Sequence, residues 1–198
     1  MMIVLLCLLV VFPKGCIPEL VLKTTKIECK TNPKFVENVT CYLKAVTWEK
    51  SLVQMDCHLK EPLRNPTVHI KLYKKDYNNQ YKPFLANVAF NLCDLIAGKA
   101  FLPYGLLMWK TLNKFTNANH SCPFVGHLFA RDMVFETSNL PSSIPMGAYW
   151  ISSTFSETYS EGSKASYGTV NWYWEIMRNK RKPKTIKGKR TTLTVVMV

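Results

Sequence analysis

The chain has 198 residues, of which 47% are hydrophobic and 20% are charged. This is the balance of a folded domain, so disorder of the whole chain is excluded, and the length fits one domain rather than two. Lys and Arg number 26 against 13 Asp and Glu, but eight of these positive charges lie within residues 178–190. Without them and Lys14, 17 basic residues face 13 acidic ones. The high pI therefore reflects a tail, and it does not indicate that the folded part binds nucleic acid.

The first 18 residues are predicted to be a signal peptide. Residues 1–12 (MMIVLLCLLVVF) are apolar and residues 13–15 (PKG) end the run, which is too short to span a bilayer. A buried N-terminal strand is the alternative interpretation. The protein is therefore expected to be secreted, and two sequons predict N-glycosylation at Asn38 and Asn119.

The folded part, expected over residues 19–177, has the sequence pattern of strands. Apolar and polar residues alternate with a period of two in residues 53–60, 68–73, 84–92 and 170–176. Such alternation is typical of antiparallel sheets with one buried face. Less regular strands are expected near residues 22–30, 40–48, 127–136 and 148–157. About eight strands separated by turn residues predict an all-β protein with two packed sheets.

One insert breaks this pattern. From Asp94 to Phe115 the apolar spacing becomes helical, with Met108, Leu112 and Phe115 on one side. Asp94 is expected to cap the first turn, and Pro103 is expected to split the insert into two short helices.

The last segment, residues 178–198, is predicted to be a disordered basic tail. Three interpretations stay open for it. It is a solvated extension, it contacts an anionic membrane or glycan, or it is removed during secretion at the dibasic residues 178–181.

The chain carries no motif of a known catalytic site, so no catalytic residue, metal or cofactor is predicted. It contains no G-x-S-x-G, P-loop, G-x-G-x-x-G or H-E-x-x-H sequence. His58 and His69 fall on the wet faces of their strands, and Cys57 is expected to be a buried thiol rather than a nucleophile. A metal site formed by His120, Cys122 and His127 is a weaker alternative, because a bridged Cys122 cannot bind a metal.

The inward positions are rich in large apolar side chains, which suggests a cavity between the sheets. Burial of a 14-carbon chain would contribute roughly 11 kcal/mol before the costs of association. The candidate lining residues are Val53, Met55, Ile70, Leu72, Val88, Phe90, Met108, Leu112, Phe155, Trp172 and Trp174. An ordinary filled core is the alternative for the same residues.

Several short motifs together resemble those of a known family. They are residues 81–85 (YKPFL), 90–93 (FNLC), 117–123 (NANHSCP) and 145–149 (PMGAY), with Cys29 and Cys41. Over about residues 26–176 they resemble a large family of secreted insect proteins of unknown function. That family is grouped with the MD-2-related lipid-recognition (ML) domains and with chemosensory relatives similar to the GM2 ganglioside activator. The resemblance implies an immunoglobulin-like β-sandwich that holds a lipid, sterol or hydrocarbon-like signal between its sheets, without catalysis.

Two disulfides are predicted, and Cys57 is expected to stay free. A hairpin that turns at residues 32–35 would place Cys29 opposite Cys41, and a bridge between Cys93 and Cys122 would pin the helical insert. The predicted function is a secreted carrier of a hydrophobic molecule, with a membrane receptor as a further partner. The alternative is an interaction protein with a filled core that acts through its surface or its basic tail.

Overall fold

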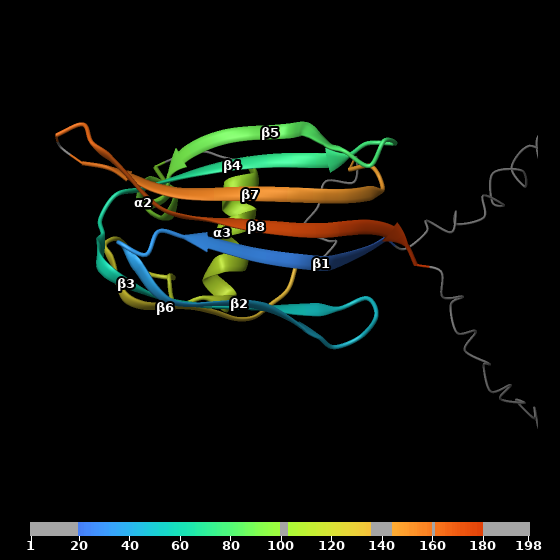
Figure 1. Cartoon of the computed structure of the whole chain (residues 1–198), viewed down its shortest axis with the longest axis horizontal. Coiled ribbons are helices and arrows are strands. Elements are labelled where there is room, and N and C mark those ends of the chain that lie inside the picture. Colours follow the sequence, from blue (N-terminus) through green and yellow to red (C-terminus); the bar gives the residue numbers. More distant parts are fainter. Residues whose placement is uncertain (1–19, 100–102, 136–143, 160, 180–198) are drawn as a thin grey trace, which may run out of the picture.

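The chain folds into two antiparallel sheets that face each other, as a computed structural model shows for residues 20–99, 103–135, 144–159 and 161–179 (Figure 1). The five-stranded sheet has the order β1-β8-β7-β4-β5 and the three-stranded sheet has the order β2-β3-β6. The strands are β1 (Leu20–Thr31), β2 (Val36–Ala45), β3 (Ser51–Leu63), β4 (Pro66–Lys75), β5 (Tyr81–Asn91), β6 (Phe124–Met133), β7 (Gly147–Thr158) and β8 (Lys164–Arg178). The predicted all-β sandwich is confirmed. The expected leader and the tail from residue 180 lie outside the described residues.

The predicted insert is also confirmed as two short helices, α2 (Leu92–Ile96) and α3 (Pro103–Phe115). Pro103 is the first residue of α3, where its missing N–H costs nothing. The predicted cap was wrong. Asn91 caps α2, because its side chain accepts a hydrogen bond from the backbone N–H of Asp94, which lies in the first turn of α2.

One long side of the sandwich is closed by consecutive strands. β1 belongs to the five-stranded sheet and β2 to the three-stranded sheet, and the turn at residues 33–35 joins them. The Cys29–Cys41 bridge is confirmed, with the Cα atoms 6.0 Å apart. The hairpin argument expected the two cysteines to face each other in one ladder. Instead, Cys29 pairs with Val170 in the five-stranded sheet, and Cys41 pairs with Met55 in the three-stranded sheet. The bridge therefore ties one sheet to the other.

The helical insert lies at the other side of the interior. α2 contacts β4 and β5, while α3 contacts β6, so the insert connects the two sheets (Figure 1). The predicted Cys93–Cys122 bridge is confirmed, with the Cα atoms 5.8 Å apart. It links α2 to the segment that leads into β6 and so also ties the sheets together.

The buried side chains form two clusters. The phenylalanine cluster comprises Phe35, Val36, Leu59, Leu63, Val68, Ile70, Leu92, Leu95, Phe124, Ala165 and Tyr167. The tryptophan cluster comprises Ile27, Val53, Leu72, Ala130, Met133, Tyr149, Trp172, Trp174 and Ile176. The phenylalanine cluster lies toward α2. The tryptophan cluster lies toward the end of the sandwich where the hairpins β2–β3 and β4–β5 turn (Figure 1).

Candidate functional site

The tryptophan cluster is the candidate binding region, because both sheets and α3 contribute to it. Tyr149 and Trp174 pair across β7 and β8, and their rings stack with centroids 4.6 Å apart. Phe84 of β5 adds a third ring, 5.8 Å from Tyr149. Leu112 of α3 packs against this cluster. Apolar and aromatic side chains from both sheets and from α3 therefore pack together in one cluster between the sheets.

The predicted lining residues divide between the two clusters. Val53, Leu72, Trp172 and Trp174 are buried in the tryptophan cluster, with Met55 and Leu112 packed against it. Ile70 belongs to the phenylalanine cluster, against which Phe90 and Phe155 pack. The candidate residues therefore fall into two groups, and Trp172, Trp174 and Leu112 lie together with Val53, Met55 and Leu72 at the tryptophan cluster. The side chain of Met108 lies outside the described residues.

Val88 lies at the rim rather than in the interior. It pairs with buried Ile70, so both face the same side, but its side chain is 39% exposed. β5 is the edge strand of its sheet, so strand β4 covers it on one side only. Alternation correctly predicts that Val88 faces inward. It does not predict how deeply the side chain is buried, because that depends on whether the strand lies at the edge or in the centre of the sheet.

Two fully buried residues of the tryptophan cluster were missed by sequence reasoning. Tyr149 and Met133 each have 0% exposure. Met133 lies three residues after buried Ala130, because a β-bulge with Asp132 at a φ of 50° interrupts β6. A period of two cannot detect that spacing. Tyr149 pairs with Lys74. The sequence signal that could have found Tyr149 is the PMGAY motif at residues 145–149, which ends with it.

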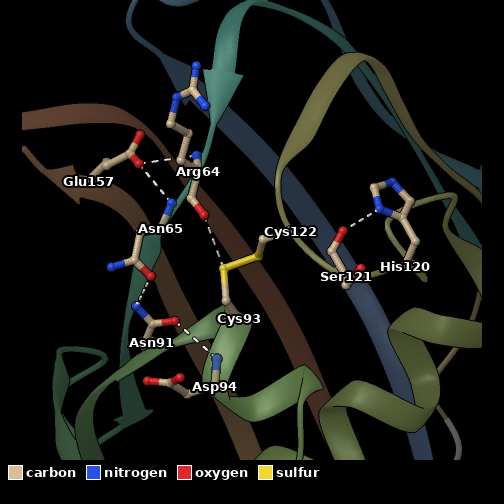
Figure 2. Close-up of a disulfide and its surroundings, with 9 residues drawn as sticks. All are labelled: Arg64, Asn65, Asn91, Cys93, Asp94, His120, Ser121, Cys122 and Glu157. Atoms are coloured by element: carbon tan, nitrogen blue, oxygen red, sulfur yellow. Dashed lines mark hydrogen bonds between the residues drawn. A yellow bond between two sulfur atoms is a disulfide. The ribbon is translucent and has the colours of Figure 1, made fainter.

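The Cys93–Cys122 bridge lies in a polar network that holds the α2 end of the sandwich (Figure 2). Glu157 is 3% exposed, and its Oε1 accepts hydrogen bonds from the backbone N–H groups of Arg64 and Asn65 at 3.1 and 2.7 Å. Asn91 donates to the side chain of Asn65 at 2.6 Å. Because the buried carboxylate is satisfied by hydrogen bonds, the network is structural.

Tyr167 completes this network. Its hydroxyl donates to Oε2 of Glu157 at 3.2 Å. Burial, together with Tyr159 and Glu157, raises the pKa of Tyr167, so it stays protonated and remains a donor. Cys93 Sγ lies 3.4 Å from the carbonyl oxygen of Arg64, which places the disulfide against the same turn.

The weaker metal hypothesis finds no support at these three residues. His120 is exposed and donates from Nδ1 to the carbonyl of Ser121 at 2.7 Å, and Cys122 is bridged (Figure 2). His127 pairs with Asp56 on the outer face of the three-stranded sheet. Within residues 20–99, 103–135, 144–159 and 161–179, no group of three His, Cys, Asp or Glu side chains is arranged to hold a metal.

Cys57 is the free thiol among the described cysteines, as predicted. It packs against the phenylalanine cluster, on the inner face of β3. Burial, and to a lesser extent the neighbouring charge of Asp56, raises the pKa of Cys57. The thiol therefore stays protonated, which suits packing rather than nucleophilic chemistry.

Asp56 is the most tightly paired carboxylate on the outer face. His127 and Arg131, both of β6, donate to its two oxygens, and the Asp56 side chain is 17% exposed. Partial burial raises the pKa of Asp56, but the hydrogen bonds and charges of both partners outweigh it, so the net pKa is lowered.

The lowered pKa of Asp56 predicts a pH dependence of stability. Its contribution should be complete above the pKa of about 3.9 in the unfolded chain and should be lost as the pH falls through the lower folded-state value. The difference in unfolding free energy between the wild type and Asp56→Asn should therefore shrink between about pH 5 and pH 2. Urea denaturation of both proteins at several pH values measures it. A difference that stays constant over this range would contradict the prediction.

The middle of the chain matches a known protein family. Residues 68–151 match the family described as "Protein of unknown function (DUF1091)". The predicted resemblance to an uncharacterised family is confirmed over this segment. The DUF1091 segment runs from β4 into β7 and includes the helical insert, the Cys93–Cys122 bridge and Tyr149. No curated protein matches the chain.

The disulfides indicate in part the cellular compartment in which the protein folds. Two disulfides indicate an oxidising environment such as the extracellular space. None of the helices in the described ranges is long and apolar enough to cross a membrane.

Proposed function

We propose that the protein is a secreted, non-enzymatic carrier of a hydrophobic molecule held between its sheets, in the tryptophan cluster. The observation that supports this most is the way the interior is bounded. Consecutive strands close one side, whereas the helices of the insert cover the other side, with Leu112 and Phe115 of α3 packed against the cluster. An amphipathic helix can move aside without breaking a strand ladder, which suits entry of a ligand.

Three finer parts of the proposal rest on the resemblance of the sequence motifs to the family described above. These parts are a relation to the ML domains, a lipid, sterol or hydrocarbon-like ligand, and a chemosensory role with a membrane receptor. The two sequons fit secretion, because Asn38 on β2 and Asn119 before β6 are exposed and accessible to glycosylation. Contact of the basic tail with an anionic surface belongs to the same proposal.

A second candidate, an interaction protein with a filled core, is favoured by two hairpin tips. Val46 in the β2–β3 turn is 52% exposed, and Tyr77 in the β4–β5 turn is 94% exposed. Both turns lie at the same end of the sandwich (Figure 1). Each sheet thus presents an exposed apolar side chain at this end, where a protein partner could cover both.

Ligand binding separates these candidates. The purified protein is incubated with a lipid extract and examined by native mass spectrometry, and displacement of the neutral dye 1-N-phenylnaphthylamine is followed by fluorescence. A carrier should acquire discrete added masses and release the dye. Leu112→Gln should weaken dye binding about fivefold, because it places an amide against the tryptophan cluster at a cost of roughly 1 kcal/mol.

The matched control is Asn113→Gln, which changes the next residue of α3, an exposed one. It should bind the dye as the wild type does. A protein that stays empty after incubation and never binds the dye would exclude the carrier and leave the interaction protein.

A further inference from the structure

Lys74 lies on the inward face of β4. Along β4 the residues that point inward are Val68, Ile70 and Leu72, all buried, and Lys74 continues the same face. Its ladder partner on β7 is Tyr149, which is fully buried in the tryptophan cluster. The apolar alternation of β4 therefore ends with a cation at the edge of the candidate binding region.

The side chain of Lys74 lies against the aromatic rings. Its Nζ is 5.6 Å from the ring centroid of Phe84 and 5.9 Å from that of Tyr149. Its Cε would lie 3.4 Å from a Cβ placed on Gly147, so its stem packs against the start of β7. Cation–π contacts of this kind stabilise a cation only partly.

No carboxylate of the described residues forms an ion pair with Lys74. Its ladder partner on β5 is a second cation, Lys82, whose Nζ donates to the side chain of Gln80 at 3.0 Å. Like charges directly opposite each other are unfavourable in a sheet. Burial raises the pKa of Tyr149, so its hydroxyl is neutral and donates to the carbonyl of Pro145. The edge of the tryptophan cluster thus carries positive charge that no carboxylate of the described residues balances by an ion pair.

We propose that the ligand is a long-chain carboxylate, whose head group accepts a hydrogen bond from Lys74 and whose chain lies in the tryptophan cluster. This inference rests on the proposed function and names the class of ligand. A carboxylate supplies the missing anion, and a charge-assisted hydrogen bond is about twice as strong as a neutral one. The apolar interior beside Lys74 suits the chain.

The test compares tetradecanoate with tetradecanol, two ligands of equal chain length that differ in the head group. Each displaces 1-N-phenylnaphthylamine, whose neutrality makes its own binding independent of Lys74. In Lys74→Met, the affinity for tetradecanoate should fall about tenfold and that for tetradecanol less than twofold. Lys71→Met is the matched control, since Lys71 is exposed on β4 and faces the opposite side, and it should leave both affinities unchanged.

Circular dichroism establishes that each variant is folded, and Lys74→Gln serves as a second variant. Salt gives an independent readout on the wild type. Raising NaCl from about 20 to 500 mM should weaken binding of tetradecanoate and leave that of tetradecanol unchanged.

The outcomes separate the two proposals. If neither ligand displaces the dye, the proposed carrier function fails and this inference fails with it. If both ligands bind equally well to the wild type and to Lys74→Met, the carrier function stands and the assignment of a carboxylate is overturned. Tighter binding of tetradecyl phosphate than of tetradecanoate would also overturn it.

Discussion

Replacing Phe124 with alanine should lower the free energy of unfolding by about 3–5 kcal/mol. Phe124 begins β6, is 1% exposed, and pairs with Leu63 of β3 inside the phenylalanine cluster. Without the ring, the protein loses the favourable free energy of transferring it from water to the core. The substitution also leaves a cavity, which the surrounding strands and the disulfide prevent from collapsing. Urea denaturation followed by circular dichroism measures the loss.

Val125→Ala is the matched control for Phe124→Ala. Val125 is the next residue of β6 and is 54% exposed, so its truncation should change the free energy of unfolding by less than about 0.5 kcal/mol. Equal losses in the two variants would show that the phenylalanine cluster does not carry the stability assigned to it.

Removing the Cys93–Cys122 bridge as the double variant Cys93→Ala/Cys122→Ala should cost about 3–4 kcal/mol. The two cysteines are 29 residues apart, and the bridge restricts the unfolded chain over the whole helical insert. Denaturation without reductant measures the cost.

The Cys29–Cys41 bridge provides the comparison for this variant. It spans 12 residues, so in the loop-entropy account its removal should cost about 0.7 kcal/mol less than that of the longer one. With reductant present, the wild type and both double variants should unfold at closely similar urea concentrations. A variant lacking Cys93 and Cys122 that is as stable as the oxidised wild type would contradict the prediction.

Strands β3, β4, β5 and β8 were predictable from regular alternation in the sequence, because one face of each strand is turned to the core. β4 shows this well, since Val68, Ile70 and Leu72 are all buried as their alternation predicts. The cap of α2 was assigned wrongly because Asn91 and Asp94 are both good capping residues, and the choice depends on where β5 ends.

The candidate site was predictable only in part. A period of two tells which side chains face inward, but it does not tell how far along the sandwich they lie. Ile70 and Leu72 are neighbours on one face of β4, yet they belong to different clusters. The role proposed for Lys74 was hidden because a charged residue reads as the end of an apolar pattern rather than as its continuation.

The two disulfides do not hold the sheets together equally along the whole length of the sandwich. One crosslink joins β1 to β2 and the other joins α2 to the approach of β6, so both hold the opposed layers together at the middle and at the α2 end. Among the described residues, no crosslink holds the end with the β2–β3 and β4–β5 turns. Spreading of the two layers should therefore meet less resistance at that end, where the tryptophan cluster and Lys74 lie. In the proposed carrier, a thicker ligand would be accommodated at that end by bending of the strands, while the α2 end keeps its spacing.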